Sequence, residues 1–172
     1  MRLGELCEAA ITVSDNTAAN LILATLGGPS GLTAYARALG DQVTRLDRTE
    51  PTLNEAIPGE VRDTTAPSAM LNNLRQLLLR KALSPGSRDT LTAWLVASKT
   101  GTARLRAGLP AGWRAGDKTG SGNHGTTNDI AIVWPDGRAP ILIAAYLTET
   151  AAESAAREGV LAEVGRLVGT AI

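Results

Sequence analysis

The sequence predicts an α+β fold in which helices come first, antiparallel strands follow, and one helix closes the chain. Apolar residues recur at helical spacing through most of residues 1–112, whereas residues 127–148 form two apolar runs around the turn Pro135–Arg138, which is typical of a hairpin. The 172 residues, 44% hydrophobic and 20% charged, are enough for one globular domain.

The individual elements follow from periodicity and from helix start and stop signals. Pro29 and Pro85 suit the first positions of helices, Ser84 suits an N-cap, and Gly40 suits a helix end. The predicted helices span 1–10, 18–26, 29–39, about 70–78 and 86–97, with a last helix from about residue 151. Strands are predicted at 114–121, 127–134 and 140–148.

Residues 47–65 have no helical or strand period. They contain Pro51, Pro58 and Gly59 together with several acidic residues. Structureless loops of this length are uncommon in compact domains and are usually functional. We therefore expect a long functional loop here.

Composition argues against several classes of function. Lys plus Arg and Asp plus Glu both number 17, and the chain has three Trp, two Tyr and no Phe, so it lacks the basic and aromatic surface that nucleic acids require. One Cys and one His cannot form a disulfide or a structural zinc site. No apolar run is long enough to cross a membrane, and Met1–Leu6 does not read as a secretory signal.

Three short motifs follow one another along the chain: Ser14-Asp15-Asn16, Glu50-Pro51-Thr52-Leu53-Asn54 and Lys118-Thr119-Gly120. Each is weak alone, because Ser-Asp-Asn usually forms a helix-capping turn and Lys-Thr-Gly is commonly a strand end. Their order and surroundings resemble class A serine β-lactamases. The resemblance is carried by LCEAAITVSDNTAANLIL, RTEPTLNEAIPGEVRDTT, LRAGLPAGW and GDKTGSGNHGTTNDIAIVWP, and it runs from about Leu3 to the closing helix.

This resemblance implies a β-lactamase/transpeptidase-like fold. It also implies hydrolysis of the β-lactam ring through an acyl-enzyme, which is an activity that confers antibiotic resistance. The implied partners are small β-lactams, with no nucleic acid or membrane bound and with no metal or cofactor. It further implies a monomer in the periplasm or secreted from the cell. Ser121 after Lys-Thr-Gly resembles members that act on cephalosporins as well as penicillins.

Residue roles also follow from the resemblance. Ser14 is similar to the hydroxyl that passes a proton to the β-lactam nitrogen, and Asn16 to the amide that binds the substrate's side-chain carbonyl. Glu50 resembles the general base that activates the deacylating water, and Asn54 the amide that helps to hold it. A general base must lie within hydrogen-bond reach of that water, which a loop clamped at both ends can provide.

The Lys118 segment resembles the strand that binds the substrate carboxylate. Lys118 would supply a cation near Ser14, while Thr119 and Ser121 would hydrogen-bond the carboxylate. The Ser121 N–H would be one oxyanion-hole donor. Gly120 and Gly122 would allow the substrate to approach the strand closely.

Four further residues are assigned supporting roles by the same resemblance. Arg104 would support carboxylate binding, because Thr127, at the position where other members carry that arginine, cannot. Asn20 would fix the loop near Glu50. Arg48 and Asp63 would form the ion pair at the neck of the loop, although the residues alone favour two solvated charges. The Glu50–Pro51 bond is expected to be cis.

Three other residues whose side chains could take part in catalysis are assigned no role. Lys99-Thr100-Gly101 is a second Lys-Thr-Gly, but it follows a helix and enters an irregular segment, so Lys99 is assigned no catalytic role. His124 lies in a Gly-Asn-His-Gly turn and is expected to be an exposed turn residue. Cys7 lies on the apolar face of the first helix and is expected to be a free, largely buried thiol.

No serine in the 172 residues begins the S-x-x-K motif that carries the family's nucleophile. We therefore expect a single partial β-lactamase domain over 1–172, with a helical region at 1–112 that includes the loop 48–63, and a strand region at 113–172. The chain alone is expected to be inactive and to leave the strand 140–148 with an open edge. The alternatives are a non-catalytic truncated product, a complementing fragment, or a penicillin-interacting transpeptidase or carboxypeptidase; Glu50 and Asn54 argue against the last.

Overall fold

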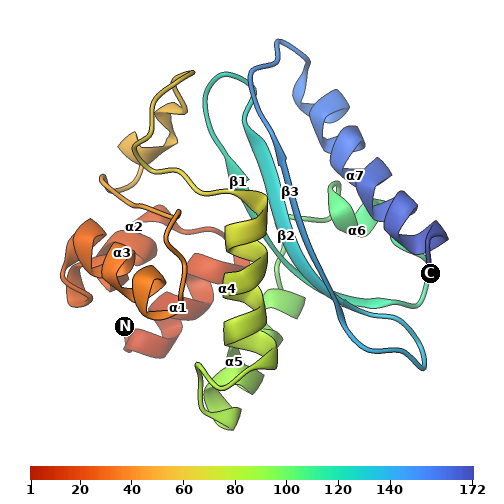
Figure 1. Cartoon of the computed structure of the whole chain (residues 1–172), viewed down its shortest axis with the longest axis horizontal. Coiled ribbons are helices and arrows are strands. Elements are labelled where there is room, and N and C mark those ends of the chain that lie inside the picture. Colours follow the sequence, from red (N-terminus) through yellow and green to blue (C-terminus); the bar gives the residue numbers. More distant parts are fainter.

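The computed structural model describes all of residues 1–172 and has the predicted order of helices, antiparallel strands and a closing helix (Figure 1). The α+β fold class is thereby confirmed. The helices are α1 (Leu3–Thr12), α2 (Asn16–Thr25), α3 (Gly28–Ala38), α4 (Pro67–Leu79), α5 (Pro85–Val96), α6 (Leu105–Gly108) and α7 (Ser154–Thr170). The strands are β1 (Arg114–Ser121), β2 (Thr127–Trp134) and β3 (Ile141–Leu147).

The three strands form one antiparallel sheet in the order β1-β2-β3, so β1 and β3 are its edges. Thr119 pairs with Asp129, and Lys118 pairs with Ile130. Because side chains alternate along a strand, Lys118 and Thr119 point to opposite faces of the sheet. This register decides what each residue of the Lys-Thr-Gly motif can reach.

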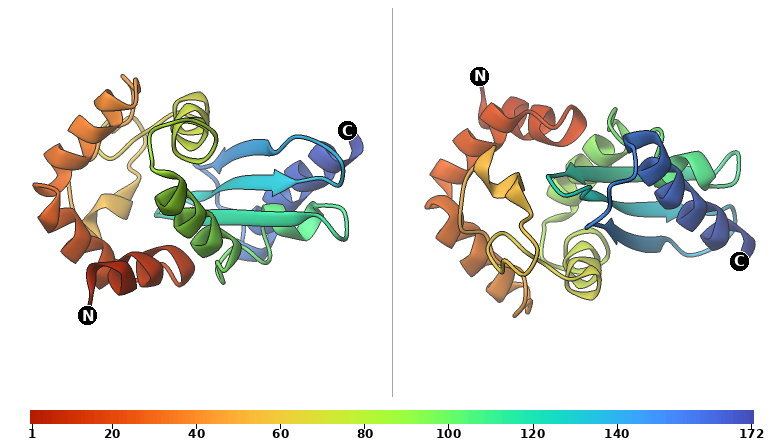
Figure 2. Two further views of the ribbon diagram at one scale, coloured as in Figure 1. Left: turned by 90° about the horizontal axis from the view of Figure 1, so that it is seen from below. Right: turned by 90° about the horizontal axis from the view of Figure 1, so that it is seen from above.

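Both faces of the sheet are covered by helices, as Figures 1 and 2 show. On one face α6 and α7 pack against a cluster of Leu105, Ala115, Ala131, Val133, Ile143, Ala145 and Leu161. On the other face α4 and α5 contribute to a second cluster of Leu74, Leu78, Leu95 and Ile132. A sheet buried on both faces is held rigidly, which makes β1 a firm support for a site.

Helices α1–α3 form a separate layer at the side of α4 and α5 that faces away from the sheet (Figure 2). The chain between α3 and α4 then passes from this layer toward the turn between β1 and β2 (Figure 1). The backbone N–H of Asn123 in that turn donates to the carbonyl of Asn54 at 2.9 Å. The loop therefore joins the helical layer to the end of the sheet.

The structure differs from the sequence prediction in a few places. The loop at 47–65 is not structureless, because Thr52–Glu55 form a 3-10 turn. The short helix α6 was not predicted; it has only one turn and therefore leaves no periodic signal. The closing helix begins at Ser154 rather than near Ala151. None of the helices is long and apolar enough to cross a membrane.

Candidate active site

The Lys118 side chain reaches across from β1 to the turn between α1 and α2. Its Nζ donates to Ser14 Oγ at 2.9 Å and to the Thr119 carbonyl at 2.8 Å. Burial lowers the pKa of Lys118, and the positive charge of Arg104 lowers it further, whereas Asp117, Asp129 and Glu50 oppose the shift. The ammonium is thus partly desolvated and lies at a hydroxyl that could exchange a proton with it.

Ser14-Asp15-Asn16 combines a helix cap with a turn that lines a cavity. Asp15 caps α2 by accepting from the Ala18 N–H at 2.7 Å, which is the structural role that such a triplet usually has. Ser14 adopts a left-handed backbone conformation with φ of 57°. A non-glycine residue in this conformation costs of order 1–3 kcal/mol and is often found at functional sites. Asp15 therefore accounts for the cap, and Ser14 and Asn16 line the cavity beside it.

The acidic loop brings Glu50 to the same cavity. Asn54 Nδ2 donates to Glu50 Oε2 at 2.5 Å, so the 3-10 turn orients the carboxylate. The Glu50–Pro51 peptide bond is cis, as expected. A carboxylate held by an amide and open to a cavity has the arrangement of a general base.

Asn20 of α2 fixes Glu50 through its backbone. Its Nδ2 donates to the Glu50 carbonyl at 2.9 Å, and its Oδ1 accepts from the Glu50 N–H at 2.9 Å. These paired hydrogen bonds use both ends of one side-chain amide. Asn20 therefore positions the loop without lining the cavity.

The neck of the loop is closed by Arg48 and Asp63. Arg48 Nε donates to Asp63 Oδ2 at 2.6 Å, and the same guanidinium bonds Glu55. The N–H groups of Asp47 and Arg48 donate to Asp63 Oδ1 at 2.7 and 2.9 Å. Burial alone would raise the Asp63 pKa, but these bonds outweigh it and lower that pKa. The pair is a structured clasp, unlike the solvated charges that the residues alone favour.

Arg104 is 7% exposed and supports the end of β1. Its Nη1 donates to the carbonyls of Gly120 and Asn128 at 2.8 and 2.7 Å, and its Nη2 donates to Ser121 Oγ at 2.8 Å. The guanidinium therefore holds β1, β2 and the Ser121 hydroxyl, which lines the cavity, together. Its positive charge also lies next to the cavity.

One cavity of about 470 Å³ brings most of the predicted site residues together. Arg48, Asp63 and Asn20 lie outside it as supports. Gly122 also lies outside: a Cβ there would come within 2.8 Å of the Asn54 carbonyl, so its lack of a side chain accommodates the loop. The residues that line the cavity are Ala10, Ser14, Asp15, Asn16, Ala19, Glu50, Asn54, Thr100, Arg104, Lys118, Thr119, Gly120 and Ser121.

Sequence reasoning missed two residues of the site. Thr100 Oγ1 lies 2.7 Å from Thr119 Oγ1, although the Lys-Thr-Gly motif that contains Thr100 had been set aside as a whole. Glu158 of α7 contacts Arg104, with 3.4 Å between Oε1 and Nε. The repeated Lys-Thr-Gly was a usable signal for Thr100. Nothing local in the sequence marks Glu158, because it lies far along the chain from Arg104.

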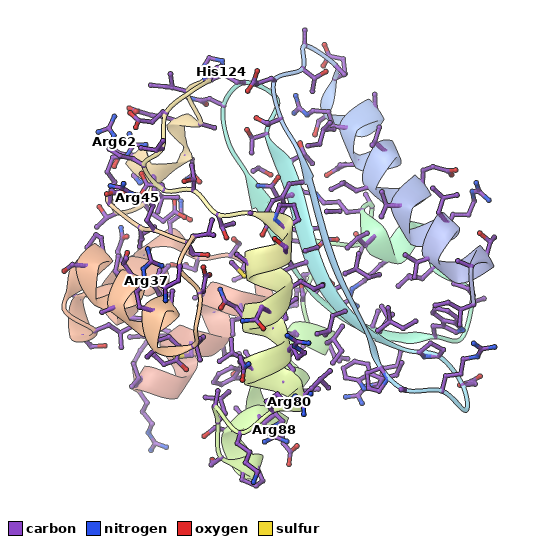
Figure 3. All side chains as sticks on the ribbon, viewed as in Figure 1. Arg37, Arg45, Arg62, Arg80, Arg88 and His124 are labelled. Atoms are coloured by element: carbon purple, nitrogen blue, oxygen red, sulfur yellow. The ribbon has the colours of Figure 1, made fainter.

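Of the residues set aside, Lys99, His124 and Cys7 do not line the cavity. Lys99 is exposed and does not line it. Figure 3 places His124 at the outer end of the β1–β2 turn, where it is exposed. Cys7 is a free thiol, as expected, and it is of intermediate exposure rather than fully buried. Its place on a helix with few buried residues explains the exposure.

The cavity contains a hydroxyl, an ammonium, a carboxylate and a guanidinium. No cluster of three or more His, Cys, Asp or Glu side chains is placed to hold a metal ion. The groups can bind a substrate anion through Lys118 and Arg104 and can transfer protons at Ser14 and Glu50. Such a set of groups could support acid–base catalysis on a small anionic molecule.

Known proteins resemble this chain along its whole length. Residues 1–172 match the Beta-lactamase enzyme family. The chain is 54% identical over 168 residues to β-lactamase CTX-M-8 of Citrobacter amalonaticus, covering 98% of this chain and 58% of that protein. It is 52% identical over 172 residues to β-lactamase AST-1 of Nocardia asteroides, covering 100% of this chain and 56% of that protein.

Solved structures give the same result. An ancestral class A β-lactamase superposes with a TM-score of 0.99 at 66% identity, covering 100% of this chain and 66% of the other. A class A β-lactamase, PenP, from Rhodopseudomonas palustris superposes with a TM-score of 0.99 at 57% identity over 100% of this chain and 66% of the other. The chain thus spans about 58% of the length of a curated relative such as CTX-M-8. It belongs to the class A β-lactamase family.

Proposed function

We propose that this chain provides the substrate-binding and deacylating part of a site that hydrolyses β-lactams through an acyl-enzyme. The observation that carries the proposal is the hydrogen bond between Lys118 Nζ and Ser14 Oγ, 2.9 Å, in the cavity that Glu50 also lines. A hydroxyl beside a partly desolvated ammonium can pass a proton to the leaving nitrogen of an opened ring.

The remaining roles follow from position in the cavity. Glu50, oriented by Asn54, would activate the water that releases the acyl group. The substrate carboxylate would lie at the end of β1, near Thr119, Ser121 and the charges of Lys118 and Arg104. Asn16 and Gly120 would contact the substrate on either side. The protein would act as a monomer, in the periplasm or outside the cell.

The proposal includes the expectation that these 172 residues alone do not turn over substrate, because none of their serines begins an S-x-x-K motif. The test is nitrocefin hydrolysis by the purified chain, alone and mixed with the N-terminal part of the ancestral class A β-lactamase, which superposes at 66% identity. We expect hydrolysis only in the mixture. Turnover by the chain alone would contradict the expectation that none of its serines is the nucleophile. An inactive mixture that forms a stable complex would contradict the hydrolase function.

Two variants separate acylation from deacylation. Glu50→Gln in the active mixture should leave acylation and stop deacylation, so the acyl-enzyme should accumulate in the mass spectrum. Ser14→Ala should instead slow acylation. A transpeptidase or carboxypeptidase would accumulate the acyl-enzyme without any substitution at Glu50. Lys99→Ala is the matched control for Lys118→Ala, because Lys99 belongs to the other Lys-Thr-Gly and is exposed.

A further inference from the structure

Asp129 is a fully buried carboxyl group of β2 that lies beside Thr119 of β1, and the proposed mechanism does not use it. Its side chain is 0% exposed, and its residue pairs with Thr119 across the sheet. Oδ2 accepts from the Leu105 N–H at 3.2 Å. Oδ1 is buried without any hydrogen-bond partner. An ionised carboxylate left with a bare oxygen in such a place is unfavourable.

Asp117, on the same face of the sheet, shows how a buried carboxylate is normally compensated. It is also 0% exposed, but it forms an ion pair with Arg106 and accepts from Ser98 Oγ at 3.4 Å. Asp129 has no ion pair of its own. The two acids therefore differ in charge compensation rather than in burial.

The charges around Asp129 act in both directions. Burial is the largest influence and raises the pKa of Asp129 to about 7, and the negative charge of Asp117 on β1 adds to it. The shift is opposed by the Leu105 N–H and by two cations, Arg104 just before α6 and Arg106 within it. Glu158 of α7 forms an ion pair with Arg104. The negative charge of Asp129 also interacts with the Lys118 ammonium of β1 and raises its pKa.

Asp129 is linked to Arg104 through the backbone of the next residue. The Leu105 N–H that it accepts belongs to the residue immediately after Arg104. Arg104 in turn holds Ser121 Oγ and the Gly120 carbonyl. A change of charge at Asp129 therefore acts on the same guanidinium that would receive a substrate carboxylate.

We propose that Asp129 is a positioning residue that holds Arg104 while uncharged, and that its ionisation weakens the binding of carboxylates in the cavity. Rising pH would add a second negative charge, after that of Asp117, beside Thr119 and close to Arg104, and this charge would repel an anion bound there. Linkage requires the reverse effect as well, so a bound carboxylate must favour the protonated form of Asp129. The ligand part of this inference rests on the proposed function.

The test is a pH titration of the Asp129 carboxyl carbon by ¹³C NMR in the 172-residue chain. We expect a midpoint near 7, because burial raises the pKa of Asp129 to about 7, and a lower midpoint in Asp117→Asn, which lacks the neighbouring negative charge. Benzylpenicillin should raise the midpoint and its methyl ester should not, because only the free acid brings a carboxylate. Affinity for benzylpenicillin should fall about fivefold as Asp129 ionises, which is the lower end of typical coupling between sites.

Asp129→Asn is neutral at every pH and should remove this pH dependence of binding. The matched control is Asp136→Asn, in the exposed turn between β2 and β3, which should keep it. A midpoint in the ordinary acidic range would overturn the inference, whatever the ligand does. A midpoint near 7 with no binding of benzylpenicillin would instead overturn the proposed function. Binding that is independent of pH in the unsubstituted chain would overturn the coupling.

Discussion

The sheet region and the layer of α1–α3 differ in how well they are packed. In the sheet region Val133 and Leu161 are 0% and 2% exposed, and helices cover both faces. In the α1–α3 layer Leu3, Leu21 and Leu26 are each more than half exposed. The cavity lies between the two, so one wall is rigid and the other is held mainly by specific hydrogen bonds such as those of Asn20 and Lys118.

The largest effect should come from truncating the sheet core. Leu161→Ala removes a buried side chain of α7 and should lower the free energy of unfolding by about 2–5 kcal/mol. Leu21→Ala, at a position 51% exposed in α2, should change it by less than about 0.5 kcal/mol. Urea unfolding measures both. Equal losses would show that the two regions are equally packed.

A second pair of variants tests how closely α6 and α7 approach. A Cβ on Gly165 would overlap the Leu105 backbone, whereas Gly159 in the same helix has nothing within 4 Å. Gly165→Ala should therefore destabilise by about 1–3 kcal/mol. Gly159→Ala should stabilise by about 0.5–1 kcal/mol, because alanine favours helix. The midpoints of thermal unfolding measure both effects. Midpoints that moved in the same direction in the two variants would contradict the close packing of α6 and α7.

Buried aspartates provide a contrast between the sheet and the helical layer. Burial would raise the Asp41 pKa, but hydrogen bonds from Thr44, Val43 and Asn73 outweigh it and lower that pKa to about 2. Because the folded pKa lies below the ordinary value of an aspartate, the ionised Asp41 stabilises the fold above pH 4, and this stabilisation is lost as the pH falls toward 2. Its size is about 2 kcal/mol. Asp129, without such bonds, is shifted in the opposite direction.

Asp41→Asn should therefore flatten the fall in stability between pH 4 and 2. Urea unfolding at a series of pH values measures this, and region-specific NMR signals show whether the helical layer is affected first. The control is Asp89→Asn, an exposed residue of α5, which should leave the acid limb unchanged. An acid limb that is equally steep in Asp41→Asn and in the unsubstituted chain would refute the assignment.

The sequence was informative where the signal is local. Ser14, Glu50 and Lys118 each lie in a short motif, and the strands around Lys118 alternate clearly. The resemblance then united motifs that lie far apart in the chain. Whether Thr100 reaches Thr119 depends on how the segment after α5 packs against β1, which no local pattern encodes.

The contacts of Asp129 were hidden for a related reason. A single Asp in an apolar strand can be read as a solvent-facing residue, and only the sheet register places Asp129 beside Thr119, on the face that α6 covers. Glu158 reaches Arg104 only because α7 packs beside α6. Contacts set by register and by helix packing were therefore the part of the site that the sequence could not supply.

The smallest expected effect concerns the hydrogen bonds that hold the loosely packed wall. Asn20→Ala removes both bonds to the Glu50 backbone and should cost about 1 kcal/mol of global stability. Its main result should be local: amide hydrogen exchange should quicken in residues 48–63 and stay unchanged in β1–β3. Asn20→Asp keeps the acceptor but loses the donor, so it should give an intermediate rate. Thr17→Ala, at an exposed position of α2, is the control. Uniformly faster exchange would mean that the loop and the sheet open together, and that the two walls of the cavity are a single unit.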